Sequence, residues 1–525
     1  MSYQVRSSGT GVANSSFAWR TSQTGTLTIN FQNPGELGAG TYSADVQLSV
    51  CLDSACAHQI ADSPGNISIT YVIQSGAQPA VSFTVEPGPT QIPSLLFTSQ
   101  TSTNLEDFSI NVTNFPSTGL WLEISQPTGG PVTSASYQAF TGPTAVVGLT
   151  LESPAALGPG FYNDSVNFSL CYDSACQNLV PGSPVTEPLD FIVSTTPGKE
   201  YTIQSVALAG ASAVAWDSAS QELYATTVEG GAHSDSLVQI DPTTGTVGAS
   251  MGFPVALTQL AISDDGQYAY VASKGESTVY RVELPSLTVD TQIPLGSIGT
   301  VPNTLYQMAV APGEPQTLAI SLDDGGSPEY TPGVVLFDGA VQRQNLLPPL
   351  NSRGSPAQIA WGVNASTLYA LRVAPASPVP VDFGEIDTVT ASASGLAIAS
   401  AWSINLQNDV VGRLVYAAGR LYGLDAIVRD ATTETILGQF TVPSGYEVIS
   451  LLPDPANLRV FILADSPRTP LLLLCYDMQS FAMTSVTALD ADIGGYPLNM
   501  TLWGTNGIAF EYGENTVAVL AGAFR

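Results

Sequence analysis

The sequence predicts an all-β protein with several domains, and three observations carry this prediction. Its 525 residues exceed what one ordinary core can hold, so two to four domains are expected. Gly (48) and Pro (37) are plentiful alongside Ser, Thr, Val and Tyr, a composition that favours strands and turns over helices. No long apolar stripe with helical period and helix caps occurs along the chain.

The charge balance argues against several classes of partner. The chain has 14 Lys and Arg against 44 Asp and Glu, a formal charge of −30. Such a surface repels phosphate backbones and anionic lipids, so no nucleic-acid partner is expected. The most apolar run, residues 471–475, is far shorter than the roughly 20 residues that span a bilayer. The start, MSYQVRSSGTG, contains no apolar signal core, so a signal peptide was either removed or never existed.

Two cysteine loops indicate export to an oxidising compartment. The sequence CLDSAC (51–56) returns as CYDSAC (171–176), each between alternating strands, which predicts a hairpin tipped by a cysteine pair. Four intervening residues place the two strand ends within disulfide reach, so Cys51–Cys56 and Cys171–Cys176 are the predicted bonds. Closing so short a loop stabilises by about 2 kcal/mol. Disulfides imply an extracellular, cell-surface or periplasmic protein.

A zinc site and a redox pair are the less favoured interpretations of these loops. Zinc needs four converging ligands, whereas the pairs lie in separate repeats and His58 of the first loop has no histidine counterpart in the second. A thioredoxin-like pair has two intervening residues at a helix start. The fifth cysteine, Cys475 in LLLLCYD, is predicted to be a buried, inert thiol.

The repeated loops define two strand-rich modules, residues 1–75 and 76–195. The second module contains IPSLLFTSQTSTNLEDFSINVTNFPSTGLWLEIS and ALGPGFYNDSVNFSL, and these passages resemble a BACON-type immunoglobulin-like domain. The resemblance implies a β-sandwich with Trp121 in its core. Alignment on the cysteine loops leaves the first module without the opening strands of the second. We therefore expect either a natural chain with further upstream modules or a reduced module.

After a linker expected at 194–200, the pattern becomes a repeat of about 48 residues. Residues 260–296 (LAISDDGQYAYVASKGESTVYRVELPSLTVDTQIPLG) resemble a YVTN-type propeller repeat. First strands are expected near 213, 260, 308, 359, 413, 449 and 500. The resemblance implies a seven-bladed β-propeller over 200–525, so the whole chain is predicted to be two immunoglobulin-like β-sandwich modules followed by this propeller.

The two ends of the repeat region predict how the ring closes. The last repeat ends without a fourth strand, whereas EYTIQSVAL (200–208) lies before the first repeat. We expect residues 200–208 to pair with the strand near 515–522, which completes the seventh blade and removes two open edges.

Residues suited to catalysis are few. The two histidines are His58 and His233, and His233 beside Asp235 is a weak general-base candidate because lone loop histidines usually face solvent. No nucleophile elbow, zincin pair or phosphate-binding loop occurs. We therefore predict that the protein is not an enzyme and has no catalytic residues. Some propellers of similar build are lactonases, so a lactonase-like hydrolase is the alternative.

Two acidic turns are weak calcium candidates, and no other cofactor is expected. One is Asp264-Asp265-Gly266, which also matches the first hairpin turn of the repeat family. The other contains Asp323 and Asp324 followed by two glycines. Carboxylate oxygens are ligands that Ca²⁺ prefers.

Three tryptophans are weak ligand-binding candidates. Trp216, Trp361 and Trp503 fall at the same point of repeats one, four and seven, where packing between blades is the favoured role and stacking on a sugar the alternative. The predicted function is extracellular or cell-surface binding and adhesion. The modules would form a stalk and the propeller a platform for a surface glycan or protein partner. A structural component of a surface layer is a further alternative, and homo-assembly is left open.

Overall fold

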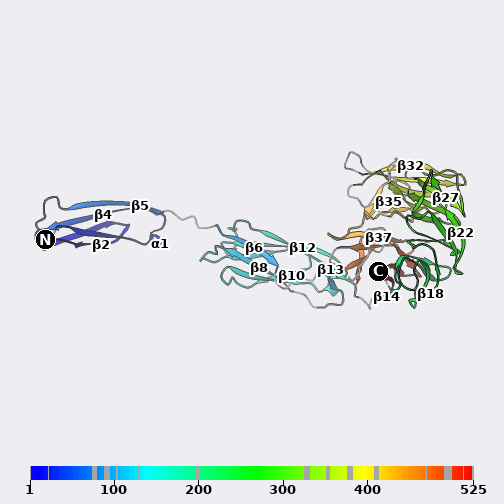
Figure 1. Ribbon diagram of the computed structural model, residues 1–525. Coiled ribbons are helices and arrows are strands. Elements are labelled where there is room, and N and C mark those ends of the chain that lie inside the picture. Colours follow the sequence, from blue (N-terminus) through cyan, green and yellow to red (C-terminus); the bar gives the residue numbers. More distant parts are fainter. Residues whose placement is uncertain are drawn as a thin grey trace.

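The computed structural model describes residues 2–21, 23–73, 80–87, 95–101, 105–126, 130–196, 201–323, 332–350, 355–374, 382–406, 413–466, 470–489, 499–511 and 513–522. The prediction of an all-β chain is confirmed (Figure 1). Helical elements within these ranges are short: α1 (Pro34–Leu37), α2 (Pro154–Leu157) and the 3₁₀ turn η1 (Gly513–Asn515). None of the helices in these ranges is long and apolar enough to cross a membrane.

Module two, defined as described residues 80–196, is two four-stranded sheets around one core. Its strands are β6 (Ser82–Pro87), β7 (Leu95–Phe97), β8 (Leu105–Thr113), β9 (Trp121–Ser125), β10 (Val132–Tyr137), β11 (Thr144–Leu151), β12 (Gly160–Cys171) and β13 (Val185–Ser194). The sheet orders are β10-β11-β8-β6 and β7-β13-β12-β9. Alternating side chains from both sheets meet in the core, as period-two apolar patterning requires.

Trp121 corrects one expectation. The residue belongs to β9, but its indole is 39% exposed, while the next residue, Leu122, is buried in the core. Successive strand residues point to opposite faces, so only one residue of the Trp-Leu pair can enter the core.

Module one, defined as residues 2–73, has the same elements as the later part of module two. Its strands are β1 (Ser2–Gly9), β2 (Val12–Trp19), β3 (Gly25–Phe31), β4 (Gly40–Cys51) and β5 (Gly65–Ile73). They form the sheets β1-β4-β5 and β2-β3, which match β9-β12-β13 and β10-β11 of module two. In the described part of module one, nothing corresponds to β6, β7 or β8.

The described residues after 200 form seven four-stranded antiparallel sheets, which we number as blades one to seven. Blade one consists of β15 (Ala211–Asp217), β16 (Glu222–Thr227), β17 (Ser236–Asp241) and β18 (Thr246–Gly252). Blade two consists of β19 (Gln259–Ile262), β20 (Tyr268–Ala272), β21 (Thr278–Glu283) and β22 (Thr288–Pro294). Blade three consists of β25 (Thr304–Ala311), β26 (Glu314–Asp323), β27 (Gly333–Asp338) and β28 (Val341–Gln342), and blade four of β29 (Ser355–Trp361), β30 (Thr367–Ala374), β31 (Asp382–Ser392) and β32 (Gly395–Leu406). Blade five is β33 (Val415–Ala417), β34 (Arg420–Tyr422), β35 (Ile427–Asp430) and β36 (Ile436–Gln439); blade six is β37 (Glu447–Asp454), β38 (Arg459–Asp465), β39 (Leu471–Asp477) and β40 (Met483–Leu489); blade seven is β41 (Met500–Trp503), β42 (Gly507–Glu511), β43 (Thr516–Gly522) and β14 (Tyr201–Ala207). A two-stranded hairpin, β23 (Ser297–Ile298) and β24 (Val301–Pro302), joins blades two and three.

The first strands of the blades contact one another in a closed cycle, β15-β19-β25-β29-β33-β37-β41 and back to β15. They therefore surround the centre of a ring, and the architecture is a β-propeller. Each expected first strand begins within a few residues of its predicted position. We call the end of the ring where first strands begin the mouth face, and the opposite end, where they turn into second strands, the turn face.

The ring closes as the sequence predicts. Strand β14 pairs antiparallel with β43 over seven residues, from Tyr201 opposite Gly522 to Ala207 opposite Thr516. Blade seven thus takes three strands from the C-terminal part of the chain and one from the segment before blade one. This pairing covers both edges that would otherwise lie open.

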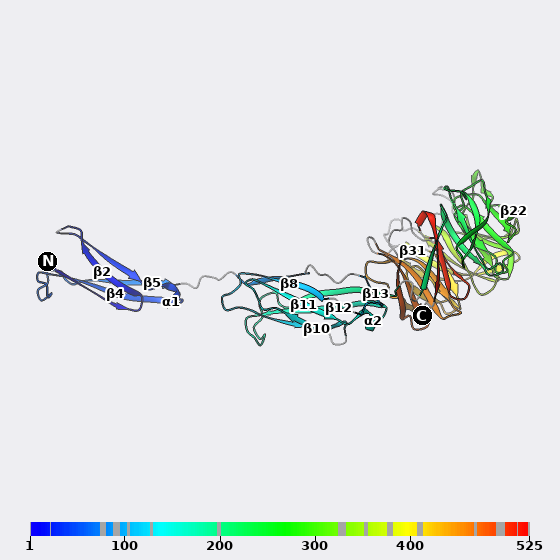
Figure 2. The same cartoon turned by 90° about the horizontal axis from the view of Figure 1, so that it is seen from below.

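Module two docks firmly on the propeller, in both views (Figure 1, Figure 2). Beyond β13, the Thr195 N–H donates to the Val486 carbonyl of β40 at 2.8 Å, and the Ala488 N–H donates to the Ser194 hydroxyl at 2.9 Å. Ile192 packs into the core shared by blades five and six. The prediction of a linker at 194–200 is wrong for Ser194 and Thr195, because both residues are buried against the edge of blade six. Residues 197–200 lie outside the described ranges.

Candidate functional site

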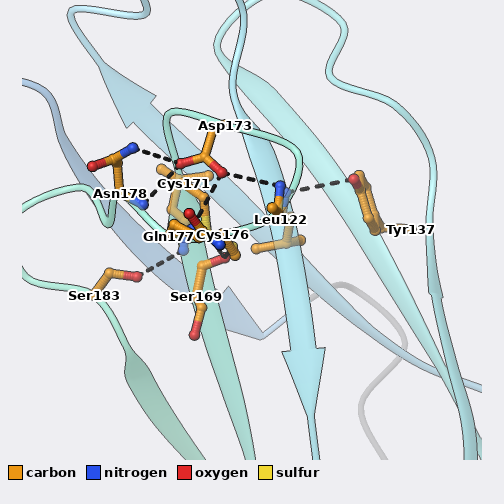
Figure 3. Close-up of a disulfide and its surroundings, with 11 residues drawn as sticks. Leu122, Tyr137, Ser169, Cys171, Asp173, Cys176, Gln177, Asn178 and Ser183 are labelled. Atoms are coloured by element: carbon orange, nitrogen blue, oxygen red, sulfur yellow. Dashed lines mark hydrogen bonds between the residues drawn. A yellow bond between two sulfur atoms is a disulfide. The ribbon is translucent and has the colours of Figure 1, made fainter.

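The cysteine loops are structural staples. Both disulfides are present, with Cα–Cα distances of 5.0 Å for Cys51–Cys56 and 5.1 Å for Cys171–Cys176. Inside the second loop, the Asp173 carboxylate accepts backbone N–H groups from Ala175 (3.0 Å), Gln177 (3.2 Å) and Asn178 (2.8 Å) (Figure 3). These hydrogen bonds, led by that of Gln177, hold the pKa of Asp173 below its usual value.

His58 has a structural counterpart, which explains its role. Its Nδ1 lies 3.0 Å from the Asp53 carboxylate, and the Asn178 amide donates to Asp173 at the same distance in the second loop. The His58 imidazole and the Asn178 amide therefore make the same contact with the aspartate of their own cysteine loop. Backbone N–H bonds from residues 57 and 58 likewise lower the pKa of Asp53. The fifth cysteine, Cys475, is free and buried, and burial raises the pKa of its thiol.

The three tryptophans lie at the turn face and pack between blades. Trp216 and Trp503 have ring centroids 6.2 Å apart and are half-buried in the core that joins blades seven and one. The Trp503 indole N–H donates to the Leu520 carbonyl at 3.1 Å. Trp361 is buried and donates to the Ala309 carbonyl of blade three at 3.0 Å. These contacts favour the packing role over sugar stacking.

His233 lies on the mouth face but at its outer rim. Its Nδ1 is 3.0 Å from the hydroxyl of Ser250, which belongs to the outermost strand of blade one. Among the described contacts, none joins the imidazole to the Asp235 carboxylate. The general-base pairing expected as a weak candidate is therefore not formed.

The acidic turns are used by the fold. The Asp264 carboxylate accepts the Gly313 N–H of the next blade at 2.8 Å, and Asp265 accepts the Ser263 hydroxyl at 2.7 Å. Asp323 ends β26, and Asp324 lies outside the described residues. No group of three or more His, Cys, Asp and Glu within the described ranges is arranged to hold a metal ion. The expectation of no cofactor, with calcium at these turns as the weak alternative, stays a prediction.

The mouth face brings together polar side chains that no sequence motif marks. Lys274, at the end of the second strand of blade two, lies 4.3 Å from the centre of the Tyr306 ring in blade three. The Tyr306 hydroxyl accepts the Gln358 amide of blade four at 2.7 Å. Burial raises the pKa of the Tyr306 phenol, the Gln358 hydrogen bond opposes this rise, and the Asp323 charge adds to it. One polar link therefore spans three blades, and Lys274 at its end is exposed.

A second polar link spans blades five to seven at the same face. The Arg413 guanidinium, just before β33, donates to the Asn499 side chain just before β41 at 2.6 Å. The Asn499 N–H donates to the Glu511 carboxylate at 2.8 Å. Burial lowers the pKa of Arg413, and the Glu511 charge opposes this change. In the order of the ring, blade six lies between the two ends of this link.

These two links form our candidate site, which we call the mouth cluster: Lys274, Tyr306, Gln358, Arg413, Asn499 and Glu511. It offers amide, phenol and cationic groups that suit hydrogen bonding to a polar ligand. Sequence reasoning missed it because its members come from five blades. One signal was available: Tyr306 and Gln358 are 52 residues apart, close to the repeat length, and both occur early in a first strand.

Comparison with known proteins does not assign a family. No protein-family model matches the sequence, and no curated protein matches it. Among solved structures, the β-propeller domain of Cps50 (Swd1) from Myceliophteria thermophila has a TM-score of 0.47 at 13% identity, covering 61% of this chain and 99% of that chain. Hydrazine synthase from Kuenenia stuttgartiensis has a TM-score of 0.45 at 11% identity, covering 61% and 97%. At these values neither protein's activity transfers to this chain.

Proposed function

We propose that the protein is an exported binding protein whose immunoglobulin-like stalk holds a seven-bladed propeller, with the mouth cluster as its ligand site. The ligand is a neutral, hydroxyl-rich surface glycan, and the protein catalyses no reaction on it. The observation that carries this proposal is the mouth cluster itself, since it gathers hydrogen-bonding groups from separate blades at one end of the ring.

The stalk assignment is supported by strand order. When β6, β8, β9, β10, β11, β12 and β13 are lettered A to G, the sheets read A-B-E-D and C-F-G, the order of immunoglobulin domains, and β7 is an additional strand beside G. The Tyr162 hydroxyl donates to the Leu157 and Gly158 carbonyls at 2.5 and 2.9 Å. A tyrosine at the start of strand F that bonds back a few residues upstream is a hallmark of this fold.

Export is supported by the two disulfides, because such bonds persist in oxidising compartments. The ring of seven four-stranded sheets and the repeat in residues 260–296 support the YVTN-type assignment. The docked junction supports the role of module two as a stalk, since a buried contact fixes the direction in which the mouth face points.

Binding is favoured over catalysis by the chemistry of the mouth cluster. The amides, phenol and cations it contains are hydrogen-bonding groups, and the contacts described above join them to one another, not to a nucleophile paired with a base. The net charge of −30 disfavours anionic polymers, which leaves neutral glycans as the best match for a site rich in amide and hydroxyl groups.

The test is a glycan array probed with the full chain and with a Tyr306→Phe, Gln358→Ala double variant. Two lost hydrogen bonds of about 0.5–1.5 kcal/mol each weaken binding by roughly 5- to 150-fold. Val363→Ser, at a position 78% exposed on the turn face, is the matched control and should bind like the parent.

Three results would contradict this proposal. The double variant could bind every glycan as well as the parent does. Binding could instead be lost with Trp121→Ala, which would move the site to the exposed indole of module two. Finally, a lactone- or ester-hydrolysing activity lost with Glu511→Gln would make the mouth cluster an active site.

A further inference from the structure

Strand β32, the outer strand of blade four, is a long open edge. It has 12 residues, whereas the outer strands of the other blades have two to seven. It ends the sheet order β29-β30-β31-β32, so one side of it pairs with β31 and the other side has no strand neighbour among the described residues. The strand lies at the outer margin of the propeller (Figure 1).

The backbone of β32 is open beyond its first residues. The Leu396 N–H donates to the Asn345 carbonyl of the segment after β28 at 2.9 Å, so this N–H points away from β31. Residues two apart on a strand direct their backbone groups to the same side, so the Ile398 N–H also faces outward. After Leu396, none of the described backbone hydrogen bonds joins this edge to another segment. The edge therefore offers unpaired donors and acceptors to a further strand.

Exposed apolar side chains surround this edge on three adjacent blades. Those that are 40–71% exposed are Val341 and Leu346 of blade three, Ile398 of β32, and Ile436 and Leu437 of β36 in blade five, which we call the outer patch. The Ser400 hydroxyl donates to the Glu434 carboxylate of blade five at 2.8 Å, which holds blade five beside β32. Among the described outer strands of the other four blades, only β14 has a large apolar side chain this exposed, Ile203. Apolar patches of this kind mark interaction sites.

Going beyond the ligand site proposed above, we propose that the outer patch is a dimer interface, in which β32 pairs antiparallel with β32 of a second copy of this chain. Such a pairing has two-fold symmetry, so the same surface serves both copies. It joins the two blade-four sheets into one continuous sheet, supplies the missing backbone hydrogen bonds and brings the two outer patches together.

The charge distribution favours a second copy as the occupant. Close to a two-fold axis a residue lies opposite its own copy, so a charge there would meet a like charge. Neither β32 nor β36 contains a charged residue, and the Glu434 carboxylate is already bonded to Ser400. A chain with a net charge of −30 repels its own copy over most of its surface. The uncharged outer patch is therefore where two copies can approach.

The docked stalk shows that this chain already uses an outer edge for assembly. Ser194 and Thr195 of module two hydrogen-bond to β40, the outer strand of blade six, and Ile192 packs into the core shared by blades five and six. In the order of the ring, blade five separates this covered edge from β32. The stalk and a second copy therefore use different edges of the same ring.

The test is the oligomeric state of the full chain, measured by sedimentation from about 0.1 to 100 µM. The parent should form a dimer with a micromolar dissociation constant. Ile398→Lys places a charge opposite its own copy and should raise that constant by about 30-fold or more. The matched control Ile203→Lys changes an isoleucine of similar exposure on the outer strand of blade seven, and should change the constant by less than about 3-fold.

Hydrogen exchange of the parent provides a second measurement that needs no substitution, so the test stays decisive if Ile398→Lys disturbs the fold. In the dimer, exchange of the Ile398 amide should slow at least 10-fold, without change in β14. A parent that is monomeric at about 100 µM would overturn the proposal in favour of a strand from a different polypeptide. A dimer with an unprotected Ile398 amide, or one weakened equally by both variants, would also overturn it.

Discussion

Replacement of Ile192 by alanine should loosen the joint between module two and the propeller while leaving both folded. The Ile192 side chain is 8% exposed and packs with blades five and six, not with the core of its own module. Its neighbour, Val193, points the other way and is fully buried inside module two. The two adjacent residues therefore separate docking from folding, and Val193→Ala is the matched control.

The magnitude follows from burial. Removal of a buried isoleucine side chain down to Cβ costs about 2–5 kcal/mol in a protein core. We expect the lower end, about 2 kcal/mol, because the junction is bounded by solvent and its two sides can close on the cavity. That value lowers the docked-to-undocked ratio by roughly 30-fold. The hydrogen bonds of Thr195 and Ser194 to β40 remain in place.

The assay is a distance distribution between spin labels on the exposed residues Gln177 and Leu458. The parent should give one narrow distribution, and Ile192→Ala a broader one with unchanged melting of each part. Val193→Ala should lower the melting temperature of module two and keep the narrow distribution. A broad distribution in the parent, or no broadening with Ile192→Ala, would refute the rigid joint.

Three further outcomes are expected. Val206→Asp places a charge at a buried position of β14 and should destabilise the propeller by at least 3 kcal/mol in denaturant unfolding. Ile203 is 42% exposed on the same strand, so the control Ile203→Asp should destabilise it by under 1 kcal/mol. Equal effects of the two changes would argue against ring closure. Trp503→Ala should cost about 2–3 kcal/mol in the same assay without changing glycan binding, and lost binding at unchanged stability would restore the ligand role of this indole. Backbone hydrogen bonds lower the pKa of Asp173 in the folded protein. The ionised carboxylate therefore stabilises the folded loop fully at a pH above the ordinary Asp pKa of about 3.9, and this stabilisation is lost as the pH falls through the lowered pKa of the folded state. Reduction of the Cys171 disulfide by a phosphine should therefore accelerate below about pH 4, and Asp173→Ala should remove this pH dependence.

The repeats explain why so much of the architecture could be predicted. Recurrence of the cysteine loop at 120 residues predicted two related modules, and their described strands share one order. The 48-residue recurrence located every first strand, and the orphan segment at 200–208 predicted its pairing with β43. The repeat length and the alternation of apolar residues can be read directly from the sequence, and they determine where strands begin and which strand is left without a neighbour.

The mouth cluster and the junction could not be predicted in this way. Arg413 and Asn499 come from blades five and seven, and their contact depends on how far the ring turns between them. The burial of Thr195 depends on which blade offers a free edge to module two. The family pattern names the Trp-Leu pair without saying which residue faces inward, so it does not distinguish the exposed Trp121 from the buried Leu122.

The most direct test of binding at the mouth face is amine-reactive footprinting of the full chain with and without its array-identified glycan. The chain has two lysines, Lys274 in the mouth cluster and Lys199 between module two and β14, so Lys199 is an internal reference. We predict that the glycan lowers modification of Lys274 at least 5-fold and leaves Lys199 unchanged. Equal modification of Lys274 in the free and bound protein would contradict a ligand site at the mouth cluster.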